Sequence, residues 1–147
     1  LVVGKGTDSD LVKSLAESPE GKNVIYIPGL PRADFEALVP ACDAGLIFLD
    51  NRFTIPNYPS RMLSYMNSSL PVIACTDKAT DVGLDITEGN FGVWCQSDNT
   101  DNYCKTVDAL NKADLELMGQ NAKQYLRDFF KTANSYEIIM NSFGEAK

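Results

Sequence analysis

The 147-residue chain contains no histidine, and its four cysteines are spaced too widely to form a Cys-x-x-Cys pair. Zinc sites in proteins are built mostly from closely spaced cysteines and histidines, so a zinc site is not expected. We interpret the cysteines as reduced and mostly buried thiols, which is the usual state of free cysteine. They are Cys42, Cys75, Cys95 and Cys104.

The chain is also short of basic residues and of long apolar segments. Thirteen lysines and arginines oppose 20 aspartates and glutamates, which gives a formal net charge of −7. This balance argues against binding to nucleic acid or to an anionic membrane, although a local pocket can still hold a small anion. No apolar run approaches the roughly 20 residues that span a bilayer, and no signal peptide is visible. We therefore expect a cytoplasmic protein.

What the sequence does contain is a regular alternation of short apolar runs with helical patterns, which is typical of βαβ units and a parallel sheet. The runs are nearly continuous in apolar character, as strands covered by helices on both faces should be. With 44% hydrophobic residues, the chain suits one domain over residues 1–147. The expected fold is an α/β, Rossmann-like, three-layer αβα domain with a mostly parallel sheet. The expected strands are Leu1–Gly4, Val24–Ile27, Ala44–Leu49, Val72–Cys75 and Phe91–Cys95.

Apolar residues at helical spacing fill the segments between and after these strands. Asp8 and Ser9 are expected to cap the first helix, over SDLVKSLAES. Pro40 is expected to shorten or kink the second helix, over PRADFEALVPAC. Two or three more helices should follow the last strand.

Ligands of doubly wound sheets bind beyond the carboxyl ends of the strands, so the loops after the strands are candidate sites. The turn Gly4–Gly6 lacks the third glycine of a dinucleotide fingerprint, and a plain tight turn is favoured over a phosphate cradle. The segment Pro28–Pro31 is either an ordinary rigid turn or a place for a flat ligand such as a base.

The third loop, DNRFTIPNYPSR, contains hydrogen-bonding and aromatic groups. Pro59 suits the first turn of a helix, so Ser60 and Arg61 would lie where free N–H groups and the helix dipole favour an anion. Arg61 would add a planar, bidentate donor for phosphate. The alternative is a capped helix with a solvated arginine. Met62, Leu63 and Met66 are expected to anchor this helix to the sheet.

The fourth loop, TDKATDVGLDITEG, follows the strand PVIAC. It offers the polar side chains of Thr76, Asp77, Thr80 and Asp81. We expect Asp81 to cap a short helix.

In order along the chain, these motifs resemble the C-terminal domain of GT-B glycosyltransferases of retaining family 4. The resemblance covers essentially the whole sequence, through VGKG, NVIYIPG, DAGLIFL, LPVIA and a late GVW strand. Its specific part is the block IPNYPSRMLSYM followed by LPVIACTD, which is similar to bacterial sugar transferases of capsule and O-antigen assembly.

The resemblance implies the donor-binding half of a longer, two-domain enzyme that uses a nucleoside-diphosphate sugar. The strand and helix that precede LVVGKG in relatives, and the N-terminal domain, would lie outside this sequence. That domain would bind a polysaccharide or lipid-linked acceptor and would mediate any contact with the inner face of the membrane. The chain alone should bind donor weakly and transfer nothing. No cofactor and no metal are implied.

The resemblance also assigns residues by their position in the motifs, although it assigns no catalytic residue. The diphosphate would contact Ser60, Arg61, Lys5 and Gly6. The ribose and the sugar would contact Ser64, Asn57 and Tyr58. The base would lie against Gly29 and Leu30.

Two glutamates of the wider family are replaced in this chain, because the corresponding positions hold Pro56 and Ser64. A serine can still share a hydrogen bond with a ribose hydroxyl, although a neutral bond is weaker than a charge-assisted one. Proline supplies no carboxylate, so the sugar contact would have to come from Asn57 or Arg52. The subgroup with the PSR motif shares these replacements, which favours a changed donor geometry over a loss of activity.

Three other functions stay open. The loss of both glutamates favours a non-catalytic nucleotide or nucleotide-sugar binding module. A nucleotide-sugar epimerase of the same GT-B architecture would rely on carboxylates and histidines near the sugar, and this chain has no histidine. A receiver-type signalling domain would need acidic residues at the end of the first strand, where the chain has Gly4 and Lys5.

Overall fold

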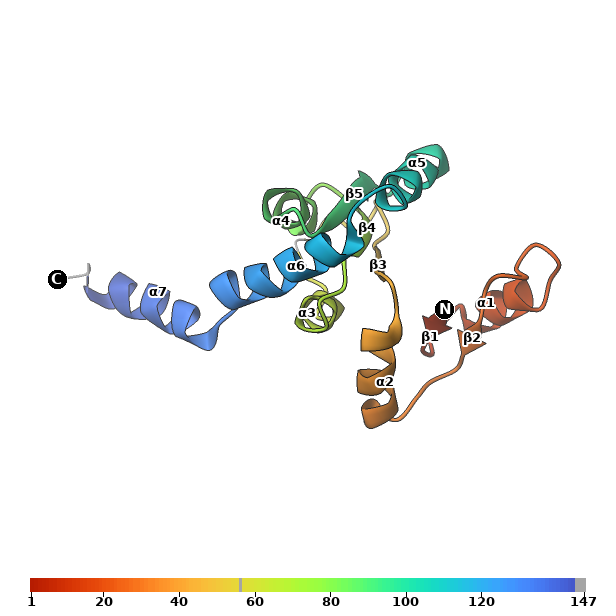
Figure 1. Ribbon diagram of the computed structural model, residues 1–147, viewed down its shortest axis with the longest axis horizontal. Coiled ribbons are helices and arrows are strands. Elements are labelled where there is room, and N and C mark those ends of the chain that lie inside the picture. Colours follow the sequence, from red (N-terminus) through yellow and green to blue (C-terminus); the bar gives the residue numbers. More distant parts are fainter. Residues whose placement is uncertain (56, 145–147) are drawn as a thin grey trace. The chain divides into compact units, whose positions relative to one another are not determined.

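The computed structural model describes residues 1–55 and 57–144. The chain divides into two compact units, Leu1–Leu38 and Val39–Lys147, and each has its own parallel sheet (Figure 1). The single domain expected over residues 1–147 stays a prediction.

The first unit is small and has little interior. Strand β1 (Val2–Val3) pairs in parallel with β2 (Tyr26–Ile27). Helix α1 (Ser9–Ala16) connects the two strands, and α2 (Arg32–Leu38) follows β2. Of the described residues in this unit, Gly21 alone is buried. Both strands are shorter than expected, since regular pairing covers only two residues of each.

Two local expectations about helix ends had different outcomes. The expected capping bond from Asp8 is wrong, because its side chain caps nothing and Ser9 Oγ instead bonds both the amide and the carbonyl of Gly6. The expectation for Pro40 is confirmed, because α2 ends at Leu38 and Pro40 lies in the short 3-10 helix Val39–Ala41.

The second unit contains a parallel sheet in the order β3-β4-β5. The strands are β3 (Gly45–Phe48), β4 (Val72–Thr76) and β5 (Gly92–Gln96). Helix α3 (Arg61–Asn67) connects β3 to β4, and α4 (Val82–Gly89) connects β4 to β5. The three strands expected in this region are confirmed, with ends that differ by at most one residue.

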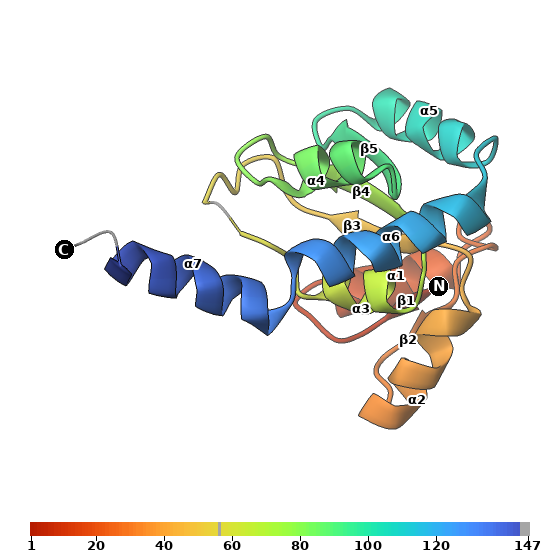
Figure 2. The same ribbon diagram turned by 60° about the vertical axis from the view of Figure 1, so that its left-hand side comes forward.

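Three helices complete this unit: α5 (Thr100–Leu110), α6 (Leu115–Phe129) and α7 (Thr132–Gly144). Asn99 caps α5 by accepting bonds from two backbone amides, and Asp114 caps α6 by accepting one from Leu117. In both views α7 extends beyond the other helices of this unit (Figures 1 and 2).

The hydrophobic core lies between one face of the β3-β4-β5 sheet and helices α3, α4 and α6. Alternate residues of a strand point to opposite faces, so Ile47 enters this core while Phe48 contacts Tyr103 of α5, with ring centroids 5.2 Å apart. Figure 2 shows α5 on the side of the sheet opposite α3 and α6. The expected three-layer αβα arrangement is thereby confirmed for this unit. The buried core residues are Ile47, Met62, Met66, Val72, Ala74, Val82, Ile86, Phe91 and Ala122.

Two of the four cysteines, Cys75 and Cys95, are buried. Cys75 and Cys95 lie opposite each other on β4 and β5. Burial, followed by the neighbouring Cys95 thiol, raises the pKa of Cys75 to about 11. Cys42 is half-buried and Cys104 is exposed, so the expectation of mostly buried thiols holds for half of them.

Candidate functional site

The carboxyl edge of the β3-β4-β5 sheet is formed by the loops that follow its three strands. Because β3 and β4 are parallel, the helix that connects them must run back past the sheet, and α3 therefore begins at this edge. The segment Asn57–Arg61 leads into α3, while Asp77 and Ser97 directly follow β4 and β5. The edge thus gathers most of the residues predicted to contact a donor.

One face of α3 presents polar side chains to solvent and the other face is buried. Ser60, Arg61 and Ser64 are exposed, whereas Met62 and Met66 are each 0% exposed. Residues three and four apart share a helix face, so the polar residues are neighbours. Leu63 is 36% exposed, and the expectation that it anchors the helix to the sheet is therefore wrong.

Ser60 precedes the first residue of α3, and its side chain makes no capping bond. Among the described residues, no acidic side chain lies within ion-pair distance of Arg61. Lys13, Arg32 and Arg52, in contrast, each pair with a carboxylate. The guanidinium lowers the pKa of Tyr65, although burial is the larger effect and raises it. Arg61 is therefore a cation available to a ligand.

Arg52, the other proposed sugar contact, is already paired. Its Nη2 lies 2.5 Å from Asp50 Oδ2, and its Nε donates to Asp50 Oδ1 at 2.9 Å. These bonds hold the pKa of Asp50 well below its usual range. A sugar would have to displace this exposed ion pair. Pro56, at the position of the first family glutamate, lies outside the described residues.

Asn57 and Tyr58 are held by neighbouring elements. Thr80 Oγ1 donates to the carbonyl oxygen of Asn57 at 2.6 Å, and Asn57 Nδ2 donates to the carbonyl of Ile55 at 3.2 Å. The ring of Tyr58 packs on Phe130, with centroids 5.3 Å apart. The hydroxyl of Tyr58 is buried, so the structure places this residue against the core instead of in solvent.

Three buried side-chain atoms in the described part of the chain have no hydrogen-bond partner: Tyr58 Oη, Asp77 Oδ2 and Ser97 Oγ. Such atoms are uncommon in native proteins. All three residues belong to loops at the carboxyl edge of one sheet. Asp77 is 3% exposed, and its other carboxylate oxygen accepts a bond from Ala79 N at 2.6 Å.

Sequence reasoning singled out Tyr58 and Asp77 but missed Ser97. Its position directly after β5 was the signal that could have revealed it. The expected capping bond from Asp81 is wrong: the Asp81 side chain makes no capping bond, and Thr80 Oγ1 instead accepts one from Val82 N at 3.5 Å.

In the first unit, Lys5 and Gly29, which are predicted to contact the phosphates and the base, lie close together. A Cβ atom added to Gly29 would lie 3.9 Å from Cε of Lys5, so the loops after β1 and β2 are adjacent. Gly29 has φ +151°, a conformation that favours glycine. The amide of Gly6 donates to Ser9 Oγ at 2.7 Å, so a phosphate would have to displace Ser9. Leu30 is half-buried.

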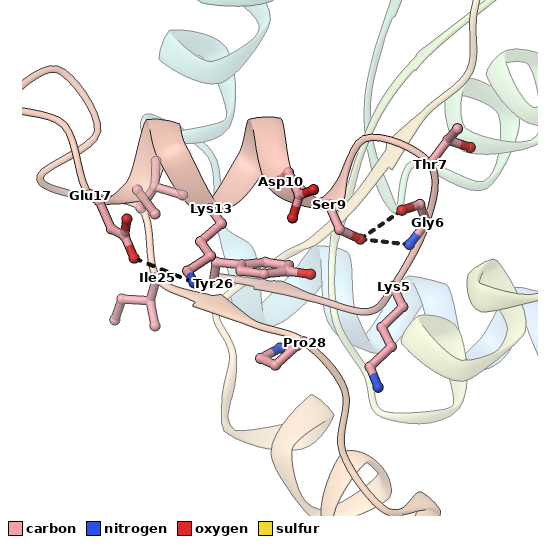
Figure 3. A pocket seen from close by; sticks show the side chains of 12 residues that line it. Lys5, Gly6, Thr7, Ser9, Asp10, Lys13, Glu17, Ile25, Tyr26 and Pro28 are labelled. Carbon is pink, nitrogen blue, oxygen red and sulfur yellow. Dashed lines mark hydrogen bonds and ion pairs between the residues drawn. The ribbon is translucent and has the colours of Figure 1, made fainter.

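A hollow of 760 Å³ lies beside α1 in this unit, and Figure 3 shows the side chains that line it. Tyr26 Oη donates to the carbonyl of Gly4 at 3.0 Å, and Lys13 pairs with Glu17 at 4.0 Å. The hollow includes Lys5 and Gly6 of the predicted phosphate contacts. Its lining is Lys5, Gly6, Thr7, Ser9, Asp10, Lys13, Ala16, Glu17, Val24, Ile25, Tyr26 and Pro28.

A second hollow, of 340 Å³, lies in the other unit among residues of α4, β5 and α5. None of the residues predicted to bind a donor lines it. Within residues 1–55 and 57–144, no group of three or more acidic or thiol side chains is placed to hold a metal ion. In the same residues, every helix is too short or too polar to cross a membrane.

The sequence of the chain is similar to that of a curated bacterial protein. The chain is 24% identical over 135 residues to the probable glycosyltransferase WbjE of Pseudomonas aeruginosa, across 92% of this chain and 34% of that protein. No protein-family model matches the chain. The chain thus spans about a third of the length of the curated relative that it matches.

Its structure is similar to the crystal structure of WaaG, a glycosyltransferase involved in lipopolysaccharide biosynthesis. The TM-score is 0.61 at 20% identity, and the match covers 86% of this chain and 33% of WaaG. The structural likeness confirms the α/β, Rossmann-like fold expected from the sequence, and both proteins that the chain resembles are named as glycosyltransferases.

Proposed function

We propose that the chain is the donor-binding part of a retaining glycosyltransferase that uses a nucleoside-diphosphate sugar. The observation that carries this proposal is the exposed face of α3, where Arg61 has no acidic partner among the described residues and lies beside Ser60 and Ser64. The likeness to two proteins named as glycosyltransferases supports the same class of activity.

The chemistry of donor cleavage explains why such a face would be useful. Negative charge develops on the diphosphate as its bond to the sugar breaks, and groups already in position stabilise that charge best. The guanidinium of Arg61 can donate two parallel bonds to phosphate, whereas the amides of Met62 and Leu63 already donate to the carbonyls of Pro59 and Ser60. We assign Arg61 and the Ser60 hydroxyl to the diphosphate, and Ser64 and Asn57 to the ribose and sugar.

In the first unit, Lys5 and Gly6 remain candidates for the phosphates, and Gly29 and Leu30 remain candidates for the base. We propose a polysaccharide or a lipid-linked sugar as the acceptor, bound outside this chain. The 147-residue chain should then bind a donor weakly without transferring its sugar.

A thermal-shift titration of the chain with ADP, GDP, UDP and dTDP tests the diphosphate assignment. A ligand that binds only the native state raises the apparent melting temperature. We expect at least one diphosphate to do so, and Arg61→Gln to weaken that binding about tenfold or more. Arg127→Gln, at an exposed arginine of α6, is the matched control and should change nothing. Equal shifts in the unmodified chain and in Arg61→Gln would contradict the assignment.

The replacement of a family glutamate by Ser64 supports a second candidate, a non-catalytic nucleotide-sugar binding module. Assays of donor hydrolysis and sugar transfer by the protein at its natural length separate the two candidates. Diphosphate binding that depends on Arg61, without hydrolysis or transfer, would favour the binding module.

A further inference from the structure

Asp77 and Ser97 occupy corresponding positions at the carboxyl ends of β4 and β5. Thr76 and Gln96 are paired in the parallel register, and the amide of Ser97 donates to the carbonyl of Thr76 at 2.9 Å. Asp77 and Ser97 directly follow this pair, and side chains at corresponding positions of neighbouring strands point to the same side of a sheet. Ligands of parallel α/β sheets bind at this edge.

Two buried polar atoms at these positions, Asp77 Oδ2 and Ser97 Oγ, have no hydrogen-bond partner in the described part of the chain. Asp77 is 3% exposed, and it is the one acidic residue that is buried among those described. Its other oxygen, Oδ1, accepts a bond from Ala79 N at 2.6 Å, so the orientation of the carboxylate is fixed. Buried polar atoms without partners destabilise a protein, so both atoms call for a partner that the ligand-free chain does not supply.

The main chain around Asp77 is held by a short series of hydrogen bonds. Trp94 Nε1 donates to Thr76 Oγ1 at 2.9 Å, and Thr76 Oγ1 donates to the carbonyl of Asp77 at 3.0 Å. Farther along the same loop, the buried Thr80 donates to the carbonyl of Asn57 at 2.6 Å. The loop that contains Asp77 therefore contacts the segment that leads into α3, where the diphosphate is proposed to bind.

The chemistry of the two unpartnered atoms fits a hydroxyl group. A carboxylate accepts hydrogen bonds and the serine hydroxyl can donate one, while a ligand hydroxyl can donate and accept at the same time. A phosphate would bring a second negative charge next to Asp77, and like charges repel strongly where little water screens them. The parts of a nucleoside-diphosphate sugar that suit this place are therefore the hydroxyls of its sugar and its ribose.

We propose that Asp77 and Ser97 form a subsite for a hydroxyl group of a nucleoside-diphosphate sugar. Asp77 Oδ2 accepts a hydrogen bond from this hydroxyl, and Ser97 Oγ donates one to its oxygen. The loop residues Lys78 and Ala79 are exposed, so a small shift of this loop admits the ligand. The inference rests on the proposed function of the α3 face and adds a contact from two other loops.

Two single substitutions in the 147-residue chain test the subsite. Ser97→Ala removes one hydroxyl, and Asp77→Asn removes the charge but keeps an oxygen that can accept from Ala79 N. Each variant is titrated by calorimetry with UDP-glucose, UDP-N-acetylglucosamine, GDP-mannose and dTDP-glucose, and with UDP, GDP and dTDP. We expect both variants to bind the best-bound nucleotide sugar about fivefold more weakly, or worse. Asp98→Asn, at the exposed acidic residue next to Ser97, is the matched control and should change nothing.

The nucleoside diphosphates decide which hydroxyl is bound. If the hydroxyl belongs to the sugar, both variants bind the nucleotide sugar more weakly and the diphosphate as tightly as the unmodified chain does. If it belongs to the ribose, both ligands lose affinity by the same factor. Either result supports the subsite.

The melting temperature of the ligand-free chain separates this subsite from a site for a bound water molecule. Ser97→Ala should leave the melting temperature the same or raise it, since an unpartnered buried hydroxyl is removed. A fall of several degrees with unchanged affinity would show that water already satisfies this hydroxyl, and it would overturn the inference.

Other outcomes distinguish this inference from the proposed function. If binding of a nucleotide sugar depends on Arg61, but Asp77→Asn or Ser97→Ala binds it as tightly as the unmodified chain, the inference fails while the proposed function stands. If the unmodified chain binds none of the diphosphates and none of the nucleotide sugars, both fail.

Discussion

The two units of the chain are held together in different ways. Every buried hydrophobic side chain among the described residues lies between Val39 and Ala122, in the second unit. The first unit instead leaves large apolar side chains in solvent, among them Leu11 at 70% and Ile25 at 64% exposure. Burial of apolar area is the main favourable term in folding, so the same substitution should have very different effects in the two units.

The largest expected effect comes from a matched pair of isoleucine truncations. Ile47→Ala in β3 removes a side chain that is 0% exposed, and it should lower the free energy of unfolding by about 2–5 kcal/mol. Ile25→Ala, next to β2, removes a mostly exposed side chain and should cost less than about 0.5 kcal/mol. Urea unfolding followed by the fluorescence of Trp94, the single tryptophan, reports on the second unit.

Amide hydrogen exchange supplies the corresponding measurement in the first unit, which has no tryptophan. It should show little change of protection at β1 and β2 in Ile25→Ala. Comparable losses of stability in the two variants would contradict the contrast between the units.

A pair of glycine substitutions sharpens the comparison with a smaller effect. A Cβ atom at Gly119 of α6 would lie 2.1 Å from the backbone carbonyl oxygen of Ser69, so Gly119→Ala must push the helix away. We expect a loss of about 1–3 kcal/mol, measured by the same unfolding experiment. Gly6→Ala in the first unit meets no atom within 4 Å and should be neutral or slightly stabilising. A neutral Gly119→Ala would show that α6 packs less closely than the structure indicates.

The difference between the units also explains where the sequence was informative. In the second unit, apolar runs predicted three strands and several helices, because burial on both sheet faces leaves a continuous apolar pattern. In the first unit the same kind of run gave strands of only two residues, β1 and β2. The periodicity of a segment shows which of its side chains are apolar. Regular strand pairing also depends on the neighbouring strands and helices, which the local sequence does not specify.

The candidate site shows a similar division. Exposure of Ser60, Arg61 and Ser64 agrees with the helix start predicted from Pro59 and from the spacing of the buried methionines. The burial of Tyr58 could not be predicted, because it depends on packing against Phe130, which is distant in sequence. Contacts between distant parts of the chain decide which polar side chains of a loop are buried and which are exposed.

The smallest expected effect comes from removing one tyrosine hydroxyl in each unit. Tyr125 Oη donates to the charged Asp85 at 2.9 Å, while Tyr26 Oη donates to the neutral carbonyl of Gly4 at 3.0 Å. Tyr125→Phe should therefore cost about 1 kcal/mol and Tyr26→Phe about 0.5 kcal/mol near neutral pH, measured by chemical denaturation.

The pH dependence of this pair provides a finer test. Burial, followed by the bond to Asp85, raises the pKa of Tyr125 to about 12, above the value of about 10 for an unfolded tyrosine. The native state thus holds the phenol proton more tightly, so this contribution to stability is complete below pH 10 and is lost as the pH rises toward 12. The stability difference between the unmodified chain and Tyr125→Phe should shrink across that interval. A difference that stays constant to pH 12 would show that Asp85 and burial do not hold this proton.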